Sequence, residues 1–237
     1  GEKVVCYINL VDGKAYTFDG INKKEYAPVP ENSDIASMRD IMLEAVASTD
    51  EALMEKYFGG EAFTEEEIKT ALKNGMLSGD ICPVLCGVGQ DGAAVSLAVD
   101  LLSDIAPSAA DVAVVCKKDE NTEDYAISAQ GPTALVVFKT IADPFVGKLS
   151  YFKVVSGSVS ADSRLLNLRT GNEERLSKVM WIKAGKQEDA DKIVAGDIGA
   201  VAKLGNVSTG DTLCDAAFGK AVVPAKFPQP QLTMAVY

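Results

Sequence analysis

The sequence predicts a mixed α/β unit, partly α+β in character, followed by an all-β antiparallel barrel. The first observation is charge: residues 1–110 contain 8 Lys and Arg against 19 Asp and Glu, whereas residues 111–237 contain 15 of each. The second is periodicity, because helical patterns occur only in the first half, and short β-rich runs fill the second. A chain of 237 residues is long enough for two domains of ordinary size.

The first half opens with short strands and continues with helices. Strands are predicted at 3–11, 15–18 and 26–29, and Asp-Gly pairs at 12–13 and 19–20 mark the turns between them. Three helices follow. The first runs from Ser33 and Asp34 to Val46, the second from Thr49 or Asp50 to Phe58, and the third, opened by a capping box at Thr64, to about Leu77. A strand at 81–85, a glycine-rich turn and a helix at 93–105 complete this unit.

The second half consists of β-rich runs separated by turn residues. Strands without intervening helices predict a small antiparallel barrel over residues 133–225. The expected strands are 135–141, 148–156, 164–168, 178–182, 200–204 and 212–214. Trp181, the only tryptophan, alternates with charged neighbours and is expected to pack in this barrel. The polar stretch that ends at Gly131-Pro132 predicts a linker at 111–132, and residues 226–237 are expected to begin a further domain.

Composition excludes several classes of function. The chain has no histidine, which rules out Ser-His-Asp and Cys-His catalysis and His-containing zinc sites within it. Its net charge of -11 argues against nonspecific nucleic-acid binding by the whole surface. No apolar run approaches 18 residues and no signal peptide is apparent, so we expect a cytoplasmic protein without a membrane partner. The five cysteines suggest reduced thiols, and Cys82 and Cys86 are expected to be buried on one face of the 81–85 strand.

One motif permits an alternative function. Residues 87–92 read GVGQDG, a GxGxxG pattern after a predicted strand and before a predicted helix, as in NAD-binding βαβ units. Gly87, Gly89 and Gly92 would then approach the pyrophosphate. Against this, the acidic residue Asp119 lies 27 positions beyond Gly92 instead of about 20. The βα alternation also ends there.

The chain resembles bacterial elongation factor G in five segments that follow the order of that family. They are STDEALMEKYFGGE at 48–61, PVLCG at 83–87, DPFVGKLSYF at 143–152, AGDIGAV at 195–201 and TGDTLC at 209–214. FPQP at 227–230 is similar to the entry to the third domain of the family. The chain also begins and ends inside strand-like runs, which indicates an excised fragment.

The resemblance implies a division of the chain. Residues 1–110 would be the later part of a GTPase domain with its inserted subdomain, and the barrel would be the second domain of translational GTPases. The parent would bind GTP and Mg²⁺ through loops that precede Gly1, since the chain contains no GxxxxGK[ST]. The fragment alone would therefore hold no cofactor, no metal and no catalytic residue, and would be inactive by itself.

The resemblance also implies contacts. The guanine loop of the family would correspond to Val88 and Gly89, where the N–H of Gly89 is retained but the family's serine hydroxyl is absent. This difference suggests a diverged paralogue. Small-subunit ribosomal RNA would contact the barrel, and the ribosomal stalk protein would contact the acidic inserted subdomain. The candidate RNA contacts are Arg164, Arg169, Arg175, Lys178, Lys183 and Lys186.

The functional hypothesis is therefore a monomeric fragment of an elongation-factor-G-like GTPase that acts in ribosomal translocation. This part would dock on the ribosome and couple the nucleotide state to later domains. One alternative is a ribosome-protection factor of the same superfamily, which would share both domains. The other is the NAD-binding domain at 87–92.

Overall fold

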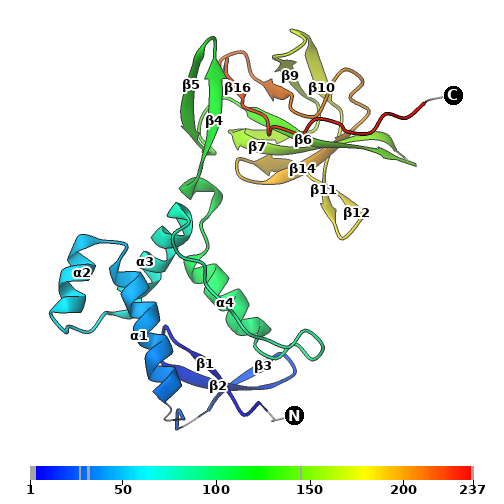
Figure 1. The fold of residues 1–237 in the computed structure, drawn as a ribbon. Helices are drawn as coiled ribbons and strands as arrows, with labels where there is room; N and C mark the ends of the chain where they lie inside the picture. The colour runs from blue at the N-terminus through cyan, green and yellow to red at the C-terminus, as the bar shows by residue number, and fades with distance from the viewer. Residues whose placement is uncertain (1–3, 27, 31–32, 145, 236–237) are drawn as a thin grey trace. The chain divides into compact units, whose positions relative to one another are not determined.

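The chain folds into two compact units, Gly1–Pro107 and Ser108–Tyr237. The computed structural model describes residues 4–26, 28–30, 33–144 and 146–235. Figure 1 shows helices only in the first unit, apart from one short 3-10 turn, and strands throughout the second. The prediction of an α/β unit followed by a β-barrel is thereby confirmed.

The first unit combines a small antiparallel sheet with four helices in its described part. The sheet has the order β1-β2-β3, formed by Tyr7–Asn9, Lys14–Asp19 and Asn22–Tyr26. The helices are α1 (Ser33–Ala47), α2 (Glu51–Phe58), α3 (Glu65–Ser78) and α4 (Val95–Ile105). Their core is apolar and includes Val11 from the turn after β1, Val46 from α1, Ile68 from α3 and Ile105 from α4.

Helix boundaries follow the capping residues that the sequence indicates. The Asp50 side chain accepts hydrogen bonds from the N–H groups of Ala52 and Leu53 and begins α2. Thr64 and Glu67 form the capping box of α3. Hydrogen bonds from Lys56 and from Thr64 lower the pKa of Glu67 from its ordinary 4.5 to about 2. These acidic residues therefore cap a helix, as expected.

Two predicted strands of the first unit are wrong. The third strand is β3, at 22–26, because Gly20 adopts a φ of +57° and the chain reverses there at once; Ala27, in the predicted range, lies outside the described residues. The run 81–85 is irregular, and Val84 is 88 % exposed. An apolar run becomes a strand only where another strand can pair with it, and the described part of this unit offers none.

The exposed run also changes the interpretation of its cysteines. Cys82 and Cys86 were expected to be buried, but both are exposed. Cys116 and Cys214 are buried in strands, and burial raises the pKa of each of these thiols. All five cysteines are free.

The second unit has thirteen strands among its described residues. An eight-stranded antiparallel sheet has the order β10-β9-β15-β6-β7-β14-β11-β12. Its strands are β6 (Ala134–Asp143), β7 (Gly147–Ser156), β9 (Ser163–Asn167), β10 (Glu173–Leu176), β11 (Val179–Lys183), β12 (Lys186–Asp189), β14 (Ile198–Ala202) and β15 (Thr212–Cys214). The pair β8 (Ser158–Ser160) and β13 (Lys192–Val194) joins it around one apolar core. Trp181 packs against this core, as predicted.

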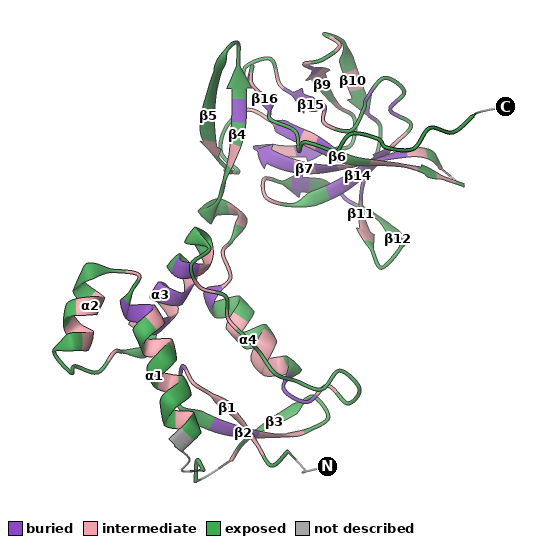
Figure 2. Ribbon diagram, in the orientation of Figure 1, coloured by how far each residue is buried: buried purple, intermediate pink, exposed green. Residues whose placement is uncertain are grey.

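The predicted linker at 111–132 is not an unstructured connection. It contains β4 (Ala113–Lys118) and β5 (Asn121–Ala126), which form a hairpin and pair with β16 (Ala221–Val222). This three-stranded sheet packs on the barrel through Cys116, Val155 and Phe218. The polar residues lie on its exposed surface, which Figure 2 shows in green over β5. The polar residues of this segment therefore belong to an exposed edge strand, β5, and not to a linker.

The C-terminal stretch lacks regular structure. Residues 223–235, which include most of the expected start of a further domain, form no helix or strand; Val236 and Tyr237 lie outside the description. Among the described residues, every helix is too short or too polar to cross a membrane.

Substitution of Gly199 by alanine should destabilise the second unit. Gly199 lies on β14 opposite Phe152, and an added Cβ would stand 2.8 Å from the Phe152 ring and against Ile193. We expect Gly199→Ala to lower the free energy of unfolding by about 1–3 kcal/mol through overpacking, measured by urea denaturation. Gly205→Ala is the matched control, since nothing lies within 4 Å of its added Cβ. Equal stability of the two variants would contradict the packing described.

Candidate functional site

The most highly organised polar cluster lies at one end of the barrel, around Asp211. Its carboxylate is only 4 % exposed and accepts hydrogen bonds from four donor atoms. Arg169 donates twice, from Nε at 2.6 Å and from Nη2 at 2.9 Å; Asn167 Nδ2 donates at 3.0 Å and the Ser208 N–H at 2.9 Å. Asn167, at the end of β9, and Asp211, just before β15, are placed by paired neighbouring strands.

Burial and hydrogen bonding act in opposite directions on Asp211. Burial tends to raise the pKa of this carboxyl, but the hydrogen bonds from Arg169, Ser208 and Asn167 outweigh it, so the pKa is lowered from 3.8. The same contact raises the pKa of Arg169. Asp211 is therefore ionised at neutral pH, and its charge is satisfied inside the protein.

The cluster fixes the loop between β14 and β15. Arg169 Nη2 donates to the carbonyl oxygen of Asn206 at 2.8 Å. From the other side, Lys148 Nζ donates to the carbonyl oxygens of Gly205 at 3.1 Å and Val207 at 2.5 Å. Two cations thus hold successive carbonyl groups of this loop, and their main role is structural.

Most of the predicted RNA-contacting cations pair with carboxylates of their own unit. Arg175 lies 2.7 Å from Asp162, Lys178 lies 2.7 Å from Asp189, and Arg164 is 3.9 Å from Glu173. Lys183 contacts Glu188 at 2.7 Å and lies over the Trp181 ring. Lys186 is exposed at the β11–β12 turn without a side-chain partner among the described residues. Five of the six candidate residues are therefore engaged in separate ion pairs, and Lys186 is the exception among the described residues.

The predicted guanine loop is an ordered turn before α4. The Val88 N–H donates to the Ala93 carbonyl, and the Gly92 N–H donates to the Val88 carbonyl. Val88 and Gly89 are both exposed, and a Cβ at Gly89 would meet nothing within 4 Å. Within the described chain the Gly89 N–H has no partner, so one backbone donor is open at this position.

The NAD-binding alternative is wrong. A dinucleotide-binding unit needs parallel strands on either side of its helix. Here the residues before the 87–92 loop form no strand, and β4, which follows α4, pairs antiparallel with both of its neighbours. The motif is thus a turn without the βαβ context.

Among the described residues, no group of three or more His, Cys, Asp or Glu side chains could hold a metal ion.

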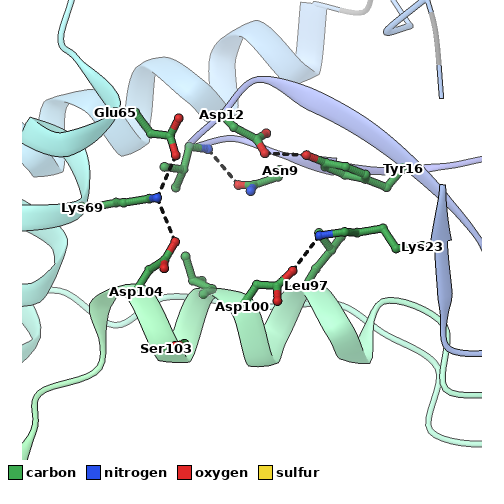
Figure 3. Close-up of a pocket in the computed structure, with 12 residues that line it drawn as sticks. Asn9, Asp12, Tyr16, Lys23, Glu65, Lys69, Leu97, Asp100, Ser103 and Asp104 are labelled. Atoms are coloured by element: carbon green, nitrogen blue, oxygen red, sulfur yellow. Dashed lines mark hydrogen bonds and ion pairs between the residues drawn. The ribbon is translucent and has the colours of Figure 1, made fainter. Parts of the chain in front are cut away.

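The first unit contains a cavity of about 320 Å³, and ion-paired side chains are among the residues that line it. Figure 3 shows Lys69 between Glu65 and Asp104, at 2.8 Å from each, and Lys23 at 2.6 Å from Asp100. Hydrogen bonds from Lys69 to Asp104 and Glu65 raise the pKa of its ammonium group. Lys69 connects α3 with α4, and Lys23 connects the sheet with α4, so these ion pairs hold the elements around the cavity together.

Tyr16 is the most buried polar residue of that cavity. Its hydroxyl donates to Asp12 at 2.7 Å. Burial, followed by the hydrogen bond to Asp12, raises the pKa of the Tyr16 hydroxyl. The phenol is therefore neutral at physiological pH and acts as a hydrogen-bond donor.

Sequence reasoning missed the roles of Asp211, Asn167 and Lys148. The available signal was the TGDTLC segment at 209–214, which contributed to the resemblance but gave no reason for its aspartate. Only the strand pairing shows that Asn167 and Arg169 reach the same carboxylate.

Comparisons with known proteins agree with this architecture. Residues 132–216 match the family model described as elongation factor G domain 2. The fold is also similar to a crystal structure of a protein from Thermus thermophilus, with a TM-score of 0.73 and 24 % sequence identity. That similarity covers 95 % of this chain but 32 % of the other, so this chain spans about a third of its length. At this identity, the second comparison concerns the fold.

Loss of the Asp211 charge should destabilise the second unit. Asp211→Asn leaves the Arg169 guanidinium facing a neutral amide and breaks charge-assisted hydrogen bonds, at a cost of about 2–3 kcal/mol in urea denaturation. The control is Asp162→Asn, which removes an exposed Asp–Arg pair and should cost less than about 1 kcal/mol. Similar losses in both variants would argue against the special role of Asp211.

The contribution of Asp211 should depend on pH. Because its folded pKa is lowered, the stabilisation is fully present above its ordinary value of 3.8 and is lost as the pH falls through the folded pKa. The stability difference between wild type and Asp211→Asn should therefore be constant near neutrality and shrink below pH 3.8. Urea midpoints at several pH values measure this difference. A gap that widened in acid would contradict the assignment.

Proposed function

We propose that the chain is an elongation-factor-G-type segment with a β-barrel second domain, and that it is the ribosome-docking part of a translational GTPase. The parent would couple GTP hydrolysis to movement of tRNA and mRNA on the ribosome. The observation that carries the proposal is the family match of residues 132–216. The fold similarity over 95 % of the chain supports it.

In this proposal the chain supplies contacts and not chemistry. Phosphoryl transfer requires groups that position the phosphates, Mg²⁺ and the attacking water. The P-loop pattern that would hold these phosphates is absent from the 237 residues, so other segments of the parent would provide it. The Gly89 N–H, which is open and exposed, would remain as a minor contact for guanine.

The proposed docking partners follow from the charge of each unit. The second unit, with its balanced charge, would approach small-subunit ribosomal RNA, and Lys186 is the candidate whose ammonium group has no partner in the described part of the chain. The acidic first unit would meet the stalk protein. We propose a monomer in the bacterial cytoplasm as the working state of the parent.

The chain should bind ribosomes by itself. We expect the purified 237-residue chain to pellet with bacterial small ribosomal subunits at low salt. It should be released as salt rises, because phosphate contacts displace counterions. Lys186→Glu should weaken pelleting, whereas Lys24→Glu, the same charge change on β3 of the acidic unit, should not. Quantification of bound protein after sedimentation measures both effects.

Absence of pelleting by the wild-type chain at low salt would overturn the proposal. Equal weakening by the two lysine variants would show that total charge, and not a docking surface on the second unit, controls binding.

A further inference from the structure

A β-bulge in β6 places two successive side chains, Phe138 and Lys139, on the outer face of the barrel. Leu135, Val136 and Val137 pair with Val154, Lys153 and Phe152, but the register then shifts, and Lys139 pairs with Tyr151. Phe138 is therefore an extra residue opposite Tyr151. Phe138 follows the ordinary alternation of a strand and is 42 % exposed beside the buried Val137. The bulge changes the face of the next residue, so that Lys139 lies on the same side as its partner Tyr151.

Phe138 belongs to a small group of aromatic and cationic side chains. Its ring centroid lies 6.4 Å from that of Tyr151, and the two rings are tilted by 49°. Lys139 Nζ lies 6.0 Å from the centroid of the Tyr151 ring. We call Phe138, Lys139, Tyr151 and Lys153 the bulge patch. Tyr151 and Lys153 alternate along β7 and so share its outer face.

The sheet around the bulge patch is apolar and nearly free of negative charge. Next to Tyr151 on this face, Ala200 on β14 and Met180 on β11 are buried, whereas Ile198 beside Lys153 is 50 % exposed. Two carboxylates stand at the margins. Asp143 accepts a hydrogen bond from the Val146 N–H, and Asp189 on β12 is paired with Lys178. In a chain of net charge -11, this face therefore combines cations with the exposed side chains of Phe138 and Ile198.

We propose that the bulge patch is a docking surface for RNA with unpaired bases. Exposed aromatic rings stack on bases, and neighbouring lysines contact the phosphates. The charge of the patch is complementary to a polyanion. The inference rests on the proposed function, because ribosomal RNA is the polyanion that the parent would meet. It differs in location from the cations of β9 to β12, most of which are engaged in ion pairs.

The test is fluorescence anisotropy of the 237-residue chain with a labelled mixed-sequence RNA, offered single-stranded and as a duplex. The wild-type chain should prefer the single strand, because stacking requires unpaired bases. Phe138→Leu keeps the apolar bulk but removes the aromatic face, and should weaken single-strand binding at least about fivefold. Lys139→Gln should lower the slope of log affinity against log salt by about one.

Two controls separate stacking from general effects. Phe58→Leu changes another exposed ring, on α2 of the acidic unit, and should leave RNA binding unchanged. Circular dichroism melting should show that Phe138→Leu folds like the wild type, since the ring is substantially exposed. A variant Phe138→Tyr, which retains the aromatic face, should restore binding.

Three results would overturn the inference. They are absence of RNA binding by the wild-type chain, equal binding of single strand and duplex, and unchanged RNA affinity of Phe138→Leu. If Phe138→Leu reduced pelleting with ribosomal subunits but kept RNA affinity, the patch would contact a protein. If wild-type pelleting persisted and only the RNA effects were missing, the bulge patch would be refuted while ribosome docking stood.

Discussion

Strand β7 organises the second unit, because its inner face is buried and its outer face is buried near both ends. Phe152 and Val154 point into the barrel core, whereas Leu149 and Val155 are buried on the outer face. Because β7 also pairs with β6 on one side and β14 on the other, its backbone groups are satisfied within the sheet. A strand buried in this way tolerates little change in register, since a shift of one residue would exchange its two faces.

The buried polar cluster around Asp211 depends on this arrangement of strands. The pairing of β15 with β9 brings Asp211 to Asn167 and Arg169, and the buried charge is acceptable because four hydrogen bonds surround it. The Lys148 ammonium group, at the start of β7, holds the same loop from the opposite side. The bulge at Phe138 also depends on β7, because it arises where the pairing of β6 with β7 shifts by one residue.

The first unit is held together differently, with fewer buried residues and with ion pairs that connect its helices and sheet. Helix caps at Asp50 and Thr64 fix where α2 and α3 begin, and Lys69 connects α3 with α4 through Asp104. Exposed pairs of this type contribute little each, so most of its stability comes from the apolar core around Ile68 and Ile105. The irregular run 81–85 shows that apolar composition is insufficient where no pairing strand is present among the described residues.

The sequence by itself determined the features that depend on neighbouring residues. The capping box at Thr64, the end of α2 at Phe58 and the main barrel strands were predicted correctly, because local geometry and periodicity decide them. Only the tertiary structure decided which segments meet. It left Cys82 and Cys86 exposed, formed a hairpin within residues 111–132, engaged Arg169 with a buried carboxylate and placed Lys139 beside Tyr151 through the bulge. Each of these outcomes depends on a partner strand or charge distant in the sequence, which no local pattern specifies.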